Sequence, residues 1–201
     1  MKIITLALIL SGASAFASEN VLWYDKPAAP GMNEALTVGG GKFGGLIYGA
    51  PDRERVVLNE ISLWTGSEIS TSDYDKMGAY QMLGELLVEL PDHKNATSYR
   101  RALDIGTAIH TVSYKIGDVT YRREAFASHA DGVMVIKLLA DKPGAYTGTI
   151  RLAGAHAETT SAEKNALGFS GELNNGLKYR AMLEAVHDGG SVEAGDGTLE
   201  F

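Results

Sequence analysis

Residues 108–128 decide the fold class, and they read AIHTVSYKIGDVTYRREAFAS. β-Branched and aromatic residues alternate with polar ones on both sides of Gly117-Asp118, which is the period-2 pattern of half-buried strands. A Gly-Asp pair suits the two-residue turn that joins twisted antiparallel strands. This stretch therefore predicts a β-hairpin with strands over 108–116 and 119–128.

Short runs of the same kind lie on both sides of this hairpin and end at glycine, proline or other turn residues. Two further antiparallel pairs are expected, one around the turn-rich segment 49–52 and one around Lys142-Pro143-Gly144. A helical turn is expected over 74–82, and the more polar stretch 154–173 is interpreted as an edge strand with its loop. The additional strands are predicted over 43–48, 55–58, 86–90, 133–140, 146–153 and 178–187.

Antiparallel strands at this density, without alternating strands and helices, predict an all-β antiparallel sandwich. After a turn at Gly195-Asp196-Gly197, an alternating strand pattern begins again over 198–201. A strand left unfinished would expose an apolar edge that invites aggregation. We therefore expect the sandwich to be incomplete at its C-terminal end and the sequence to be a fragment of a longer protein.

The first seventeen residues have the order of a secretory signal peptide. Lys2 supplies a positive charge, residues 3–10 are apolar except for Thr5, and Ala15-Phe16-Ala17 places small residues at the cleavage positions. This apolar run is well short of the roughly 20 residues that a membrane-spanning helix needs. We predict cleavage after Ala17 rather than Ala15, a mature domain over 18–201, and export to the periplasm or the cell exterior, with no membrane contact afterwards.

Composition excludes several classes of function. The 201 residues contain no cysteine, which excludes disulfides, thiolate metal sites and cysteine nucleophiles. The net charge of −7, without a basic cluster, makes nucleic acid an unsuitable partner. Hydrophobic residues make up 45% of the chain, which is enough to build a globular core.

The segment 39–44 contains a G-x-G-x-x-G match, but its surroundings contradict nucleotide binding. A strand pattern follows it where a dinucleotide site needs a helix, and Phe43 follows Lys42 where a phosphate loop needs Ser or Thr. We interpret these glycines as permitting positive φ at a corner of the sheet. None of the five histidines stands four residues from another, and His129 is expected in a surface loop.

Residues 58–66, LNEISLWTG, contain the candidate binding residues. In one interpretation Trp64 stacks on the face of a sugar while Asn59 and Glu60 bond to its hydroxyl groups. In the other, Trp64 packs into the core while Asn59 and Glu60 fix a loop, and the pattern alone favours this second interpretation.

Several motifs, taken in order, resemble the N-terminal part of glycoside hydrolase family 95, which comprises α-L-fucosidases with some α-L-galactosidase activity. The resemblance extends from about Leu22 to Leu152 and weakens beyond. Several motifs in the same order and at matching spacing identify a family more specifically than a single motif does. The motifs of this chain are LWYDKPA at 22–28, NEAL at 33–36 with the segment that follows to 49, LNEISLWTG at 58–66, LGEL at 83–86, YRRALD at 99–104 and YRREAFAS at 121–128.

The resemblance implies an N-terminal β-sandwich of the supersandwich type, linked to a separate (α/α)6 barrel that performs the catalysis. In that family a barrel Glu is the general acid, Asn and Asp activate a water, the anomeric centre is inverted, and neither metal nor organic cofactor takes part. None of those barrel residues has a counterpart here, so no catalytic residue is assigned. The implied partners are the barrel and a fucosylated oligosaccharide or glycan with terminal α-1,2-linked fucose.

One departure from the family lies in Gly39-Gly40-Gly41-Lys42, where the family usually has an Asn within the glycines and Arg in place of Lys. The departure leaves the conformation of that turn open. A second class of function also remains open, namely an exported, non-catalytic sandwich that binds carbohydrate or supports assembly.

Overall fold

The computed structural model describes residues 20–66 and 77–201, and within them nearly all regular structure is β-strand. The predicted signal peptide, 1–17, lies outside the described residues. In chain order the elements are β1 (Val21–Tyr24), β2 (Leu36–Gly39), β3 (Phe43–Ile47), β4 (Arg53–Glu60), β5 (Gly84–Glu89), the 3-10 turn η2 (Pro91–His93), β6 (Thr97–Asp104), β7 (Ile109–Ile116), β8 (Val119–Ser128), β9 (Val133–Ala140), β10 (Thr149–Gly154), β11 (Ser161–Glu163), β12 (Ala166–Glu172), β13 (Lys178–Glu184), β14 (Glu193–Ala194) and β15 (Thr198–Glu200).

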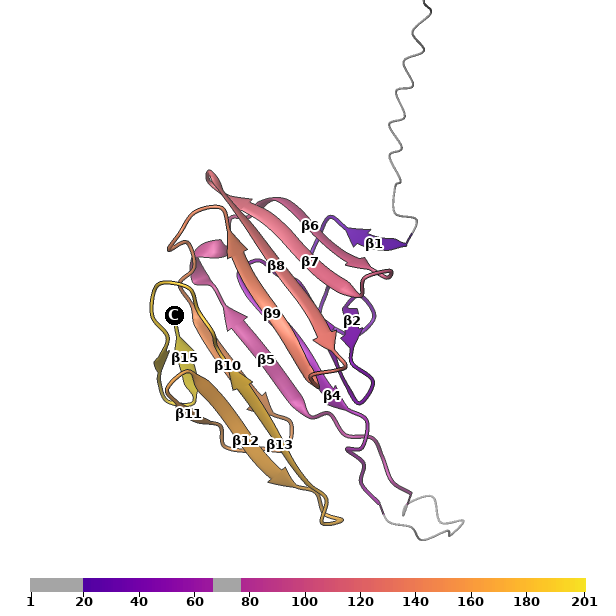
Figure 1. The fold of residues 1–201 in the computed structure, drawn as a ribbon. Helices are drawn as coiled ribbons and strands as arrows, with labels where there is room; N and C mark the ends of the chain where they lie inside the picture. The colour runs from indigo at the N-terminus through magenta and orange to yellow at the C-terminus, as the bar shows by residue number, and fades with distance from the viewer. Residues whose placement is uncertain (1–19, 67–76) are drawn as a thin grey trace, which may run out of the picture.

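The strands form three antiparallel sheets. The five-stranded sheet has the order β1-β6-β7-β8-β9, the seven-stranded sheet β14-β15-β10-β5-β4-β3-β2, and the three-stranded sheet β11-β12-β13. In Figure 1 the five-stranded sheet and the three-stranded sheet lie over the seven-stranded sheet. The prediction of an all-β antiparallel sandwich is confirmed.

Two neighbouring clusters of buried apolar side chains hold the layers together. One lies between the five- and seven-stranded sheets and includes Val56 and Val88. The other lies between the three- and seven-stranded sheets and includes Leu152 and Phe169. Alternate residues of β5 are buried, as expected for a strand with one face on the core.

The two predicted hairpins at Gly117-Asp118 and at 49–52 are confirmed. Ile116 pairs with Val119 across the first turn, and Ile47 pairs with Val56 across the second. Between β2 and β3, Gly41 has a φ of 93°, and Gly40 N donates to Phe43 O at 3.0 Å. The glycine-rich segment is therefore a tight hairpin turn, as interpreted, rather than a nucleotide loop.

The predicted pairing of 133–140 with 146–153 is wrong. The strands exist as β9 and β10, but β9 pairs with β8, whereas β10 pairs with β5 and β15. Ile136 of β9 and Ile150 of β10 pack against the same buried cluster from opposite layers. The segment after β9 therefore crosses the sandwich instead of closing a hairpin.

Three other expectations also change. The described part of the predicted helical turn, 77–82, is not helical, because Tyr80 forms a β-bridge with Trp64. The stretch 154–173 contains two strands, β11 and β12, of which β12 is the centre of its sheet. The strand at the C-terminal end, β15, is no open edge, since it lies between β10 and β14.

A cluster of buried polar side chains joins the five-stranded sheet to the loops beneath it. Arg101 donates to Lys26 O at 2.9 Å and to Glu34 O at 2.7 Å. Arg123 lies 3.3 Å from Glu54, and both side chains are buried. His110, on β7 between these two arginine-bearing strands, is buried as well. Within the described residues, no helix is long and apolar enough to cross a membrane.

Candidate functional site

The predicted binding residues lie where β4 ends and the chain enters two close antiparallel limbs, 61–66 and 77–82, which we call the stem. Thr65 N donates to Ala79 O at 3.0 Å, and Gln81 N donates to Leu63 O at 2.8 Å. A Cβ on Gly78 would lie 2.1 Å from Thr65 O, so the limbs approach too closely for a side chain there. The stem is therefore a fixed part of the fold.

The stem places Trp64 on the surface, with 47% of the residue exposed. Its indole Nε1 donates to Ile61 O at 3.0 Å, and its ring meets Tyr80 edge-to-face with the centroids 5.5 Å apart. The interpretation that Trp64 packs into the core is wrong. Leu63 occupies the core position instead, because neighbouring residues in an extended chain point to opposite sides.

Asn59 and Glu60 do not act together. They are consecutive residues of β4, so their side chains leave opposite faces of the sheet. The Glu60 carboxylate accepts hydrogen bonds from Ser62 N, at 2.9 Å, and from the Ser62 hydroxyl. The structure thus brings Glu60 to the stem beside Tyr80 and Trp64, while Asn59 faces the other side.

Sequence reasoning missed two residues of this site. One is Tyr80, the ring partner of Trp64. The other is Asn175, in the turn between β12 and β13, whose Nδ2 donates to Trp64 O and to Gly66 O, both at 2.9 Å. An Asn-Gly turn is readable from the sequence, but no local signal shows that it reaches a loop more than a hundred residues earlier.

The electrostatics of the stem suit a neutral polar ligand. Partial burial, together with the nearby Glu60 carboxylate, raises the pKa of Tyr80 above its ordinary value. The surface thus combines an aromatic face with a hydroxyl donor and a carboxylate acceptor. Aromatic surface with a few polar groups is the combination that recognises sugars and similar amphipathic ligands.

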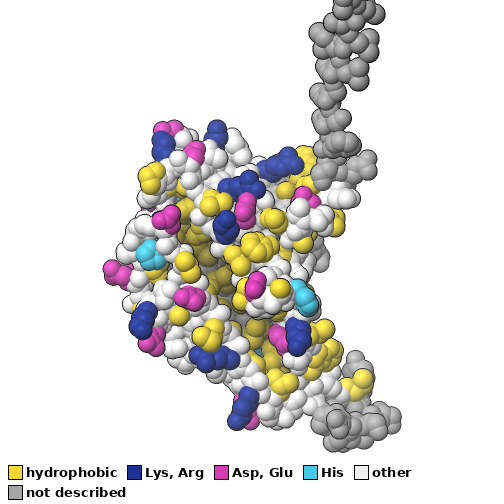
Figure 2. Space-filling model, viewed as in Figure 1, with side chains coloured by type: hydrophobic (Ala, Val, Ile, Leu, Met, Phe, Trp, Pro, Cys, Tyr) yellow, Lys and Arg dark blue, Asp and Glu magenta, His cyan; other side chains and the backbone are white. Residues whose placement is uncertain are grey.

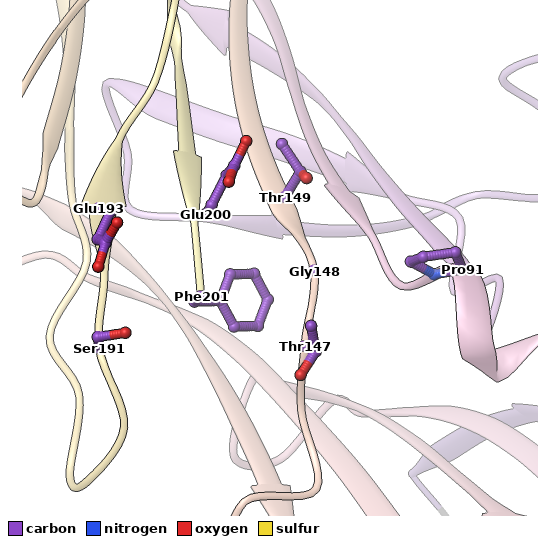
Figure 3. A pocket seen from close by; sticks show the side chains of 8 residues that line it. All are labelled: Pro91, Thr147, Gly148, Thr149, Ser191, Glu193, Glu200 and Phe201. Atoms are coloured by element: carbon purple, nitrogen blue, oxygen red, sulfur yellow. The ribbon is translucent and has the colours of Figure 1, made fainter.

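A second hollow contains two carboxylates, and it is less suited to catalysis. Glu193 and Glu200 are direct partners on β14 and β15, and Figure 3 shows them beside the ring of Phe201 and the backbone of Gly148. Both glutamates are exposed to solvent. The general acid of a glycosidase is usually a carboxyl group shielded from water, and this hollow leaves both carboxylates open to solvent.

The buried Glu54 has the opposite properties. Burial raises its pKa, against the opposing effect of Arg123. Its oxygen accepts from Gly49 N at 2.7 Å, and the residue is 3% exposed. No substrate can reach it, so Glu54 holds a loop against Arg123. The described residues also contain no group of three metal-binding side chains.

Comparison with known proteins gives consistent similarities. The family model described as glycosyl hydrolase family 65, N-terminal domain, matches residues 22–79 and 69–201. A probable alpha-fucosidase A of Aspergillus oryzae is 28% identical over 168 residues, covering 66% of this chain and 23% of the relative. Alpha-L-fucosidase 2 of Arabidopsis thaliana is 28% identical over 219 residues, covering 80% of this chain and 26% of the relative. A probable alpha-fucosidase A of Aspergillus niger is 25% identical over 233 residues, covering 92% of this chain and 29% of the relative. The chain thus spans about a quarter of the length of these curated relatives.

Proposed function

The chain belongs to the family of glycosyl hydrolase family 65 N-terminal domains, and we propose that it is the β-sandwich domain of an exported α-L-fucosidase. Its identification as the N-terminal domain of a fucosidase-like glycoside hydrolase is confirmed by the family match and the fucosidase relatives. The proposed reaction is hydrolysis of terminal α-1,2-linked fucose with inversion at the anomeric centre. The relatives' names support the sugar, and the resemblance to family 95 supports the linkage and the stereochemistry.

The proposal assigns the chemistry to a barrel domain in the rest of the polypeptide. One observation supports placing the catalytic residues in another domain. Within residues 20–66 and 77–201, no pair of carboxylates is open to substrate and has one of its two groups buried. An inverting pair also needs the carboxyl groups roughly 6.5–9.5 Å apart around a water. The two exposed glutamates of the second hollow instead occupy directly paired positions on adjacent strands.

Fucose release from 2′-fucosyllactose tests this division. The 201-residue chain should release none, and a protein carrying the following codons of the same reading frame should release fucose with the inverted anomer formed first, as followed by proton NMR. Turnover by the 201-residue chain, or a longer chain that hydrolyses only other sugars, would contradict the proposal. Export is tested on the secreted protein, whose first residue should be Ser18 by N-terminal sequencing.

We further propose that the stem contributes to sugar binding through Trp64 and Glu60, with Tyr80 supporting the indole ring. Asn59, on the opposite face of β4, is the weakest member of the proposed set. Replacement of Trp64 by Ala in the full-length enzyme should raise KM about tenfold, on the order of 1.4 kcal/mol, while kcat changes little.

The chain offers a matched control in its other tryptophan, Trp23, which is 56% exposed on β1 in the five-stranded sheet. Trp23→Ala removes a similar exposed ring and should leave KM unchanged. Equal KM values for wild type and Trp64→Ala, with a lower melting temperature for the variant, would leave Trp64 a purely structural residue.

The second candidate function is a non-catalytic, carbohydrate-binding sandwich. The observation in its favour is that Trp64 is already exposed and fixed by the stem in this domain alone. It predicts that the variant Trp23→Phe, in which Trp64 is the only tryptophan, changes its tryptophan emission on titration with fucosylated oligosaccharide. A reading frame that ends at Phe201 would favour this candidate over the enzyme.

A further inference from the structure

Two edge strands of the same layer leave a gap over the seven-stranded sheet. β9 is the last strand of the five-stranded sheet, and β13 is the last strand of the three-stranded sheet. Both sheets cover one face of the seven-stranded sheet, since apolar residues from all three meet in the two core clusters. In Figure 1, β5 and β10 are visible behind the gap between β9 and β13.

The floor of this gap is apolar and incompletely covered. Leu58 and Ile150 of the floor, and Leu183 on the inward face of β13, pack against both core clusters, yet each is only partly buried. Leu58 and Ile150 belong to central strands of the seven-stranded sheet, where a complete sandwich buries inward-facing side chains fully. Figure 2 shows a hollow with hydrophobic side chains in this part of the same view.

One wall of the gap is the inward face of β9. Met134, Ile136 and Leu138 alternate along this strand and are partly buried against the first cluster. The strand reads VMVIKLLA, so Lys137 is its only charged residue. A long apolar edge of this kind is normally paired or covered, because it otherwise recruits other chains.

The backbone along the gap is free to pair. β9 is hydrogen-bonded to β8, and apart from the Tyr146 hydroxyl, which donates to Leu139 O, no other described group bonds to its backbone. β13 likewise pairs with β12 alone among the described strands. Two free edges over an apolar floor fit an added β-strand better than a folded partner.

We propose that this groove receives an extended segment, apolar at every second residue, that pairs with β9 and joins the five- and three-stranded sheets into one layer. The segment comes from the polypeptide that, in the longer relatives, accompanies this domain, which covers only 23–29% of their length. Phe201 packs against the first core cluster, to which the apolar residues of β9 also belong. Pairing of β9 with a second copy of the chain is the competing occupant, and it would make the protection of β9 depend on protein concentration.

The inference rests on the proposed function only in taking the domain as part of a longer polypeptide. Hydrogen exchange followed by mass spectrometry compares the 201-residue chain with the longer product of the same reading frame. Peptides from β9 should exchange at least tenfold more slowly in the longer protein, whereas peptides from β7, paired on both sides in either protein, should not change. The dye ANS should bind to the shorter chain and lose most of its fluorescence in the longer one.

A pair of variants in the longer protein tests the position of the groove. Leu183→Lys places a charge on the inward face of β13, against the apolar floor, and should restore fast exchange in β9, whereas Met182→Lys, on the exposed face of β13, should not. Equal β9 exchange in the short and long proteins would overturn the proposal. So would a reading frame that stops at Phe201, or protection of β9 in the 201-residue chain that rises with its concentration and shows self-pairing instead.

Failure of the groove and failure of the enzyme are separable. Slow β9 exchange in a longer protein without fucosidase activity would support the groove and refute the proposed reaction. Fucosidase activity in a longer protein whose β9 exchanges fast would support the proposed reaction and refute the groove.

Discussion

Protonation of His110 should make the sandwich unstable in mild acid. The side chain is 1% exposed on β7, and its Nε2 has no hydrogen-bond partner among the described protein groups. Burial, with the positive charges of Arg101 and Arg123 on the flanking strands, lowers the pKa of His110 from 6.5 to about 4. The imidazole is therefore neutral in the folded chain at neutral pH.

The sign and the size of the effect follow from this shift. Between pH 6.5 and pH 4 the unfolded chain binds a proton at His110 that the folded chain does not, so stability falls as the pH falls. At 1.36 kcal/mol for each pKa unit, the full effect is about 3 kcal/mol, and about 2.5 kcal/mol of it is lost by pH 4.5. The buried Glu54 acts in the opposite direction, because its raised pKa favours the folded state in acid. Wild type must therefore be compared with a variant that lacks only the histidine.

Urea unfolding of wild type, His110→Gln and the exposed-site control His187→Gln measures the effect. From pH 7.5 to pH 4.5, wild type and the control should each lose about 2.5 kcal/mol more than His110→Gln, whatever the variant's stability at neutral pH. If the variant does not fold, the proton NMR titration of His110 in wild type gives its pKa directly. Parallel stability curves, or a titration near 6.5, would refute the interpretation that His110 is held neutral by its surroundings.

Two further substitutions test the packing of the fold. Leu199→Ala, at a fully buried position of β15, should lower the unfolding free energy by about 2–5 kcal/mol in urea, and Met182→Ala, on an exposed face, by less than about 0.5 kcal/mol. Similar losses for the two would show that β15 is not part of the core. Gly78→Ala should separate the limbs of the stem and shift the emission of Trp64 in a Trp23→Phe background, since its Cβ would overlap Thr65 O. Gly132→Ala is the control: it adds a methyl group in open space, at a position with positive φ and away from the stem, and should leave the emission unchanged.

Local sequence patterns predicted the positions of the strands better than they predicted which strands pair with each other. The hairpin at Gly117-Asp118 could be predicted because a two-residue turn and two alternating strands determine one another within a single stretch. The partner of β9 could not, because a Pro-Gly turn followed by another strand describes a hairpin and a crossover between layers equally well. Which layer a strand joins depends on apolar contacts made far away in the sequence.

The candidate site shows the same limit of sequence patterns. Trp64 was readable as a candidate, but its exposure depends on Leu63 taking the core position, and an apolar run does not say which member faces inward. Tyr80 and Asn175 reach Trp64 through a bridge and two hydrogen bonds that no spacing in the sequence reveals. The extension of β4 through Glu60 also separates Asn59 from Glu60, because consecutive strand residues face opposite sides of the sheet.

The way in which the stem is held bears on what it can contribute to an enzyme. Its limbs are joined by backbone hydrogen bonds, and Asn175 fastens the outer end of one limb to the three-stranded sheet. Trp64 is thus positioned when the domain folds, so a sugar that stacks on it does not have to order the loop on binding. A rigid aromatic face binds the ground state and the transition state of a distant reaction equally well. Such uniform binding lowers KM without raising kcat, and for this reason Trp64→Ala should change KM alone.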